Sequence, residues 1–461
     1  MVTTDGRGVV SHAGSRLLAD LADVTAVTGQ LGDELARPGR RPVHDPGRVL
    51  IDMAVAVADG ARTISDVAVL GHQPALFGQV AADSTCWRLL DRIDDDAVAG
   101  IARARAAARE VAWAQYAEVH GAPFPAATVA GRELPGLVLD LDASIVLAHS
   151  EKEQAAPTFK GSFGYHPMLA FCDNTAEFLA GTLRRGNAGA NTAADHIIVL
   201  DQALRQVPER HRYGAPILVR TDTAGCTKAF LAHLRALAKT GVTCEFSVGW
   251  AVNGREHDAI ATVPKRVWAD AIDADGGHRD GASLAEITDL LPARTLADYP
   301  VGTRVIVRRE RPHPGAQLDL IETRDGWRYT AFATDTLIGV GGQLAFLDAR
   351  HRAHARVEDR IRCAKDTGLD HFPSRSFAIN TAWLQVVMLA VDLLAWTQTL
   401  LLDGALAKAE PKTLRYRLLH VAARITRGSR RLWLRIQHSW PWARDLAEAF
   451  ARLRALPLPT G

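Results

Sequence analysis

The sequence predicts a mixed α/β protein, with an all-helical segment before the α/β part and a helical segment after it. Three observations predict this class. Apolar residues recur at helical spacing over residues 44–120, short apolar runs bounded by turn residues begin at Leu137, and helical and strand patterns then alternate as far as residue 252. Strands followed by alternating helices and strands are typical of a mixed sheet with helices on its faces.

The length of the chain indicates more than one domain, because 461 residues exceed the size of one typical core. Its hydrophobic content of 48% and charged content of 23% are those of an ordinary folded protein. We expect a weakly structured N-terminal segment (1–43), a helical domain (44–125), the first part of the α/β domain (132–252), a β-rich insertion (253–348), the second part of the α/β domain (349–402) and a basic helical C-terminal region (403–461).

Helical signals dominate residues 44–120. Val49, Leu50, Met53 and Val57 lie on one helical face, and helix-start patterns occur at residues 63–66 and 83–85. Asp94 opens a long Ala/Arg-rich helix that reaches about residue 116, with acidic residues placed favourably at its N-terminus.

The α/β part begins with apolar runs at residues 137–142, 144–148 and 167–172, which predict three consecutive strands. A helix (192–204), a strand (217–220), a helix (228–239) and a strand (244–249) follow. Ribonuclease-H-like domains have this order of elements, so we expect a ribonuclease-H-like mixed sheet. Residues 303–309, 318–323 and 327–334 are strand-like, with a turn at 324–327, and predict the β-rich insertion.

One segment, residues 378–402, approaches the length of a membrane span. It contains Asn380, Gln385, Asp392 and Gln398, so we expect a buried helix and no membrane partner. The N-terminus lacks an apolar signal core, and the five scattered cysteines form no CxxC pair. These features favour a reducing, cytoplasmic location, and the Ala/Arg/Gly-rich composition favours a bacterial one.

The net charge of +2 conceals a basic region near the C-terminus. Between Lys408 and Arg444 there are ten Lys and Arg residues and one acid, Glu410. Such a block suits a polyanionic partner, and a solvated helix face is the alternative.

Three carboxylates are the main candidates for chemistry. Asp142 and Asp222 end apolar strands, and Glu358 lies on a charged helix far downstream. Carboxylates that share a pocket repel one another and normally need a divalent cation, and Mg²⁺ prefers oxygen ligands. Convergence of the three side chains would build a two-metal phosphodiester site for cutting and joining DNA, with Mn²⁺ as a substitute for Mg²⁺. Taken singly, each aspartate could merely cap a turn, and Glu358 could belong to a salt-bridged surface helix.

The helix around Glu358 carries basic residues on the same predicted face. His354, Glu358, Arg362 and Lys365 are spaced so that an acid and several phosphate-binding groups would project together.

Several short motifs resemble those of DDE-type insertion-sequence transposases with a β-rich insertion, and most closely the group numbered thirteen-eighty. The matching pieces, in the family's order, are residues 139–144, 159–171, 183–187 and 219–223 and the helix bearing Glu358 and Lys365.

The resemblance implies that Asp142, Asp222 and Glu358 form the catalytic triad, with Asp142 preferred over Asp140 because Ser144 follows it by two residues. It also implies double-stranded DNA as partner (terminal inverted repeats and target DNA), a homodimer in the synaptic complex, and a nucleoid-associated location. One departure is that His351 and His354 occupy positions where the family usually carries Tyr and Arg, and His donates to phosphate more weakly at neutral pH.

Further DNA contacts are expected with less support from the sequence. Arg184 and Asn187 could hold the DNA backbone or pack a loop against the sheet, and Trp327 could stack on an unpaired base or lie buried in a strand. Lys160, Tyr165 and His166 are candidates for lining the same cleft. For residues 44–125, a helix-turn-helix that binds DNA and a plain helical cluster both remain open.

Two other functions compete with the transposase hypothesis. One is a catalytically inactive DNA-binding protein derived from a transposase, and metal-dependent nicking would discriminate against it. The other is a structural α/β protein with unrelated acids, in which the three carboxylates would lie far apart.

Overall fold

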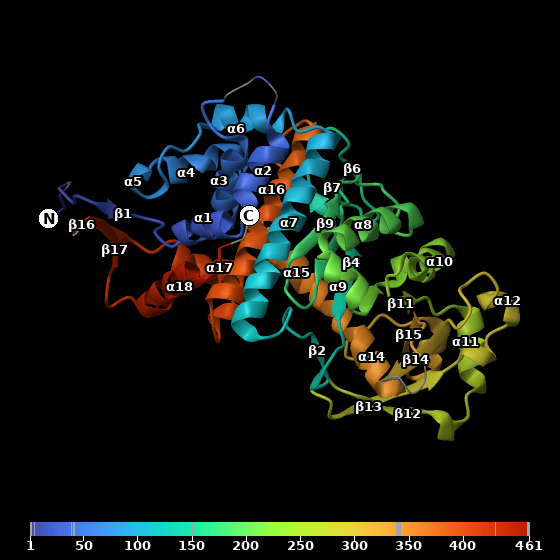
Figure 1. Ribbon diagram of the computed structural model, residues 1–461. Helices are drawn as coiled ribbons and strands as arrows, with labels where there is room; N and C mark the ends of the chain where they lie inside the picture. Colours follow the sequence, from blue (N-terminus) through green and yellow to red (C-terminus); the bar gives the residue numbers. More distant parts are fainter. Residues whose placement is uncertain are drawn as a thin grey trace.

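A computed structural model describes residues 2–3, 5–37, 39, 42–149, 151–337, 343–428 and 430–458. Within these residues the fold combines a body of helices with a large mixed sheet (Figure 1). The mixed α/β class expected from the sequence is confirmed.

The sheet has nine strands in the order β12-β13-β14-β15-β11-β10-β4-β8-β9. β4 pairs in parallel with β10, and β10 in parallel with β11, whereas all the other pairs are antiparallel. The strands are β4 Leu137–Ala143, β8 Met168–Cys172, β9 Phe178–Thr182, β10 Ile217–Thr221, β11 Cys244–Trp250, β12 Ala269–Ile272, β13 His278–Glu286, β14 Arg304–Glu310 and β15 Arg328–Thr334.

Helices cover both faces of the sheet around β8. Leu169 and Phe171 pack into the core shared with the helical body, whereas Met168 and Ala170 pack into a second core with α8 (Ala193–Gln206) and α10 (Lys228–Ala236). Successive strand residues point to opposite faces, so this alternation shows that β8 is buried on both sides.

The helical body centres on α16 (Phe377–Leu401), which packs against α3, α7 and β9. In Figure 1, α7 and α16 run side by side between the other helices and the sheet. The remaining helices are α1 Ser15–Val24, α2 Val27–Leu35, α3 Pro46–Asp59, α4 Ala68–Gly71, α5 Pro74–Phe77, α6 Asp83–Leu90, α7 Asp95–His120, α9 Glu209–Gly214, α11 Gly254–Thr262, α12 Ala293–Leu296, α13 Leu320–Asp325, α14 Leu344–Arg352, α15 Arg356–Ala364, α17 Pro411–Leu414 and α18 Ala443–Ala455.

α16 is long and apolar enough to cross a membrane by length and composition, but 78% of its most apolar stretch is buried inside the protein. The expectation of a buried helix over this stretch is confirmed.

A buried charge network joins the helical body to the sheet. Arg109 of α7 lies 2.7 Å from Glu177, in the turn between β8 and β9, and 2.7 Å from Asp392 of α16. Arg105 lies 2.8 Å from the same Asp392 carboxylate, and all four side chains are at most 1% exposed. Since breaking a buried ion pair leaves an uncompensated charge, this network fixes how the helices dock on the sheet.

The N-terminal segment differs from the expectation of weak structure over residues 1–43, of which residues 1, 4, 38, 40 and 41 lie outside the described part. α1 and α2 fall in this range, and Leu17, Leu21 and Leu31 are fully buried in the main core. α1 is stabilised by packing against α3 and α16, and α2 by packing against α3 and α7, and neither has a side-chain cap, so the sequence pattern alone did not reveal them.

The second predicted strand also differs from the expectation, whereas the third, residues 167–172, is β8 of the main sheet. Residues 144–148 do not enter the main sheet: β5 (Val146–Leu147) joins β6 (Ala156–Pro157) and β7 (Phe163–Tyr165) in a small separate sheet. The strand that completes the antiparallel edge of the main sheet is β9, which the sequence did not predict. A further two-stranded sheet pairs β2 (Thr128–Val129) with β3 (Arg132–Glu133).

The insertion does not form a separate β unit, because β12 to β15 continue the central sheet beyond β11. Residues 318–323, expected to be a strand, instead contain the start of α13. Asp319 caps this helix and forms a capping box with Glu322, which outweighs the strand-like alternation.

The C-terminal region differs from the expected helices as well. Residues 423–436 form the hairpin of β16 (Ala423–Gly428) and β17 (Arg431–Ile436), and β1 (Val9–Val10) pairs with β16. The sequence alternates between apolar and basic residues here, which is a strand pattern that the high charge concealed.

Candidate active site at the carboxyl ends of β4 and β10

Asp142 and Asp222 lie at the same edge of the sheet. In the parallel pair of β4 and β10, Leu141 faces Thr221, and each aspartate is the next residue of its strand or strand end. The Asp142 side chain is partly buried and Asp222 is exposed. Asp222 also accepts a hydrogen bond from the backbone of Ala224 at 2.9 Å, so it caps the turn after β10 while its second oxygen stays free of that bond.

Glu358 is exposed in the first turn of α15, which packs against β4. Two contacts on either side of it fix the helix to the strand. His354 Nδ1 lies 2.8 Å from Asp140 of β4, and Lys365 Nζ donates to the carbonyl of Ile145 at 3.0 Å. Glu358 is therefore held between two anchors to the chain segment that carries Asp142.

The three carboxylates influence one another electrostatically. Burial, followed by repulsion from the charge of Asp222, raises the pKa of Asp142 to about 6, and the charge of Glu358 adds to the same effect. Attraction by His354 opposes this shift. Mutual repulsion of this kind is expected where carboxylates share a pocket that a cation can occupy.

Asp140, two residues before Asp142, has a different environment. Arg220 of β10 forms a bidentate pair with it at 2.8 and 2.7 Å and also lies 2.9 Å from Asp173. Although burial opposes it, attraction by Arg220 and the hydrogen bond from His354 hold the pKa of Asp140 at about 2. The oxygens of Asp140 are thus occupied within the protein, which makes it a scaffold residue.

The two histidines upstream of Glu358 have separate surroundings, because a 3-10 turn at Ala353–Ala355 interrupts the expected continuous helix. His351 stacks on Phe332 with ring centroids 4.7 Å apart and lies 3.0 Å from Ser247. Burial, then repulsion from His354, lowers the pKa of His351 to about 3, so its ring is neutral and faces the sheet. His354 is buried, and its Nε2 has no hydrogen-bond partner within the described residues.

Basic groups lie close to the carboxylates. Burial and repulsion from Lys160 lower the pKa of Lys365, while the charge of Asp142 acts in the opposite direction. His166 is buried, and burial together with repulsion from Arg184 and Lys160 lowers its pKa, while the charge of Asp222 opposes that shift. The structure therefore brings Lys365, Lys160 and His166 into the electrostatic neighbourhood of the two aspartates. His196 is a further residue of this neighbourhood that the sequence did not reveal. Burial lowers its pKa, and the charge of Asp222 opposes that shift.

Other predicted DNA-contacting residues have different positions. Arg362 is exposed and forms ion pairs with Asp359 and Glu410, at 3.1 and 3.0 Å. Arg184 is buried, 2.6 Å from Asp195, which matches the alternative of a loop packed against the sheet. Asn187 is exposed in that loop.

Trp327 immediately precedes β15 and is partly buried. The guanidinium groups of Arg309 and Arg311 lie 4.8 and 4.2 Å from its ring centroid, so its contacts are within the insertion. Tyr165 is fully buried, and its hydroxyl donates to the backbone of Glu153.

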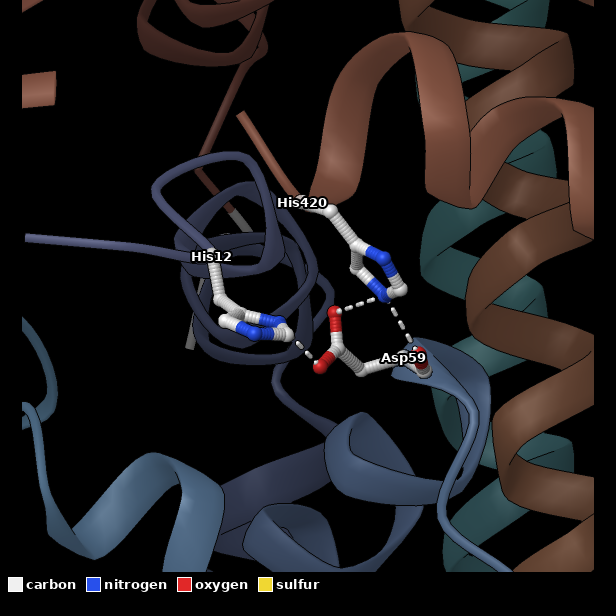
Figure 2. A group of neighbouring side chains, drawn as sticks. All are labelled: His12, Asp59 and His420. Atoms are coloured by element: carbon white, nitrogen blue, oxygen red, sulfur yellow. Dashed lines mark hydrogen bonds and ion pairs between the residues drawn. The ribbon is translucent and has the colours of Figure 1, made fainter. Parts of the chain in front are cut away.

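Among the described residues, His12, Asp59 and His420 are the one group of at least three potential metal ligands whose ligand atoms all lie within 4.8 Å of one another (Figure 2). The side chains of Asp142, Asp222 and Glu358 do not approach one another that closely. His12 Nδ1 lies 2.6 Å from the Asp59 carboxylate, and His420 Nε2 lies 2.7 Å from the Asp59 carbonyl and 3.4 Å from its carboxylate. Despite burial, the hydrogen bonds from both rings and from Ser15 hold the pKa of Asp59 at about 2.

Both imidazoles direct a nitrogen to oxygens of Asp59, and one of these is a backbone carbonyl that accepts from an N–H. This arrangement is a hydrogen-bonded clasp between the N-terminal segment, the end of α3 and the start of the C-terminal hairpin. The carboxylate-only set at β4 and β10 fits a hard divalent cation better, because such ions prefer oxygen ligands.

Comparison with known proteins gives one clear match. The family model described as "Transposase DDE domain group 1" matches residues 1–458. Among solved structures, one described as a cryo-EM structure of the piggyBac transposase synaptic complex with hairpin DNA is similar at 9% sequence identity, over 87% of this chain and 80% of that chain, with a TM-score of 0.41. A similarity of that size carries no further argument. No curated protein matches the sequence.

Proposed function

The chain belongs to the family Transposase DDE domain group 1, and from that membership we propose that it cuts DNA at the terminal inverted repeats of a transposable element and joins the freed ends to target DNA. The observation that carries this proposal is the parallel register of β4 and β10. In this register the positions of Asp142 and Asp222 follow the paired residues Leu141 and Thr221. His354 and Lys365, on either side of Glu358, contact Asp140 and Ile145, which supports a site shared by the three carboxylates.

We assign the catalytic roles to Asp142, Asp222 and Glu358, as the carboxylates that hold Mg²⁺, with Mn²⁺ as a substitute. When bound, two such ions supply activation of the attacking oxygen and stabilisation of the leaving oxygen. Support for a divalent cation comes from the donor set, which contains only carboxylate oxygens around a mutually repelling cluster.

The remaining residues position the DNA and the carboxylates. Lys365, with Lys160 nearby, places positive charge where a phosphate would approach. Asp140 holds the His354 ring through Nδ1, and the Nε2 atom of the same ring is buried without a hydrogen-bond partner among the described residues, so His354 positions α15 and does not face the DNA. Arg220 of β10 forms ion pairs with Asp140 of β4 and with Asp173, which follows β8, and so holds these strands together. In this assignment Arg184, Arg362 and Trp327 have structural contacts, and Asn187 remains a candidate DNA contact.

Finer features of the proposal follow from the same reasoning. The strand order β9-β8-β4-β10-β11, antiparallel and then parallel, supports a ribonuclease-H-like catalytic domain formed by residues 132–252 and 349–402. We further propose that the chain is a member of the insertion-sequence group numbered thirteen-eighty. The same proposal includes helical DNA-binding residues at 44–125, a homodimer when two element ends are synapsed, and a bacterial cytoplasmic, nucleoid-associated location.

The test uses purified full-length protein and labelled duplexes carrying the inverted repeats of the element that encodes it. We expect Mg²⁺-dependent nicking by the wild type and a loss of at least about a thousandfold in Asp142→Ala, Asp222→Ala and Glu358→Gln, since each removes a direct transition-state contact. Duplex binding by the same variants, measured by fluorescence anisotropy, should be largely retained.

Asp359→Asn is the matched control, because Asp359 is the adjacent exposed acid of the same helical turn and is paired with Arg362. Full nicking by any one of the three variants removes that residue from the site. A wild-type protein that binds the ends but never nicks them in Mg²⁺ or Mn²⁺ supports the inactive DNA-binding alternative.

A further inference from the structure

The β16–β17 hairpin has one apolar and one basic face. Figure 1 shows it together with β1 at one end of the molecule, away from β4. Because successive residues of a strand point to opposite faces, the hairpin has one set of side chains on each face. Ala423 is buried, and Ile425, Leu434 and Ile436 are packed against the main core. The opposite face consists of Arg424, Thr426, Arg431, Trp433 and Arg435.

On this basic face, two arginines lie directly opposite each other. Arg424 faces Arg435 in the ladder, and Thr426 faces Trp433 next to them. Like charges directly opposite across a strand pair are destabilising, so this pairing costs the isolated hairpin stability. The hairpin therefore carries a feature that packing within the chain does not explain.

No acidic side chain of the described residues forms an ion pair with Arg424, Arg427, Arg431 or Arg435. This contrasts with many other arginines of the chain, such as Arg362 and Arg444, which are paired with nearby acids. Trp433 is 48% exposed beside these charges, with the Arg435 guanidinium 5.9 Å from its ring centroid. Unpaired arginines can bind the negative charges of a polyanion, and an exposed aromatic ring among them can pack on a flat or apolar part of the same molecule.

We propose that the β16–β17 hairpin is a surface that binds duplex DNA, separate from the carboxylate site, through the phosphate-facing arginines 424, 431 and 435. A two-stranded ribbon has the dimensions that the major groove of B-form DNA admits. This inference rests on the proposed function for the identity of the polyanion, and it names a binding surface that the catalytic geometry does not include.

The hairpin is rigidly attached to the body, as a DNA-gripping element must be. Val9 and Val10 of β1 pair with Arg424 and Ala423. In the clasp shown in Figure 2, His12 follows β1 by two residues and His420 precedes β16 by three. The basic face is thus presented by a three-stranded sheet fixed at its base and not by a free loop.

The test compares the full-length wild type with the double variant Arg424→Thr/Arg435→Thr on a fluorescein-labelled duplex of mixed sequence. Each phosphate contact contributes nearly one unit to the slope of log affinity against log salt, so we expect the slope to fall by about two and the affinity at about 0.1 M salt to fall roughly ten- to a hundredfold. Thermal stability should be unchanged or higher, because Thr favours strands and the like-charge pair is gone.

Arg266→Gln/Arg454→Gln is the matched control, since it removes the same number of charges from exposed positions that also have no ion-pair partner among the described residues. The proposal is overturned if the Arg424/Arg435 variant, folded by circular dichroism, binds the duplex with the affinity and salt slope of this control. A nicking assay distinguishes this proposal from the proposed function. If the wild type never nicks DNA but the Arg424/Arg435 variant binds the duplex more weakly than the wild type, the hairpin proposal stands and the transposase proposal fails. If the wild type nicks DNA and the Arg424/Arg435 variant binds as tightly as the control, only the hairpin proposal is refuted.

Discussion

Asp142→Asn is expected to stabilise the protein in the absence of divalent cations, even though it removes a proposed catalytic residue. Burial and the repulsion from Asp222 raise the pKa of Asp142 from 3.8 to about 6. One pKa unit corresponds to about 1.4 kcal/mol, so the charged carboxylate costs the folded state up to about 3 kcal/mol. An amide in the same place carries no charge and avoids this cost.

The sign of the pH dependence follows from the raised pKa. The folded protein holds the Asp142 proton more tightly than the unfolded chain does, so the cost is absent below the unfolded pKa of 3.8. It grows as pH rises and is complete above the folded pKa of about 6. Urea unfolding in EDTA should therefore give similar stability for Asp142→Asn and wild type below the unfolded pKa of 3.8, and a difference of up to about 3 kcal/mol above pH 7.

Asp140→Asn is the control, because it makes the same chemical change two residues away on the same strand. Arg220 is fully buried against Asp140, so loss of that carboxylate leaves an uncompensated charge and should destabilise the protein by roughly 3–5 kcal/mol at neutral pH. The reasoning is refuted if both variants destabilise the protein to a similar degree at pH 7, since the two aspartates would then have equivalent environments.

Two further predictions concern stability outside the site. Asp392→Ala should destabilise the protein by roughly 3–5 kcal/mol in urea unfolding, because it leaves Arg105 and Arg109 buried without their shared partner, and a loss below about 1 kcal/mol would contradict this account. The clasp of Asp59 and His420 should stabilise the fold most between about pH 4 and pH 6.5. The pKa of Asp59 is lowered in the folded protein, so its contribution to stability is lost as pH falls toward the folded value of about 2. The pKa of His420 is raised in the folded protein, so its contribution is lost as pH rises through the folded value. His420→Asn should lower stability most inside that window and less once pH has risen through the folded pKa of His420, and a uniform loss at all pH values would count against a titrating clasp.

Much of the central sheet was predictable from the sequence because its inner strands are buried on both faces. β4, β10 and β11 are short apolar runs bounded by turn residues, and α8 and α10 between them have clear helical periodicity. β9 escaped prediction because it is brief and follows the buried Glu177, whose partners Arg109 and Trp396 come from distant helices. The formation of β9 therefore depends on tertiary contacts and not on a local sequence pattern.

The candidate site was partly predictable for the same physical reason. Strand-end aspartates on neighbouring parallel strands meet at one edge, so the positions of Asp142 and Asp222 follow from the strand pattern once pairing is assumed. The place of Glu358 depends on the contact between His354 and Asp140, which are 214 residues apart, and no local signal encodes it. The catalytic roles of these residues stay predictions until nicking is measured.

The division between Asp140 and Asp142 explains how a repelling carboxylate cluster can persist at the edge of a stable sheet. Arg220 neutralises Asp140 and ties β4 to β10, so the strand ends cannot separate to relieve the repulsion between Asp142 and Asp222. The electrostatic cost is then stored in the folded state and is released by whatever cation neutralises the carboxylates. Divalent-cation binding should consequently stabilise the wild type most at the pH values where Asp142 is charged, and it should stabilise Asp142→Asn much less, because that variant has already lost the charge that the cation would neutralise.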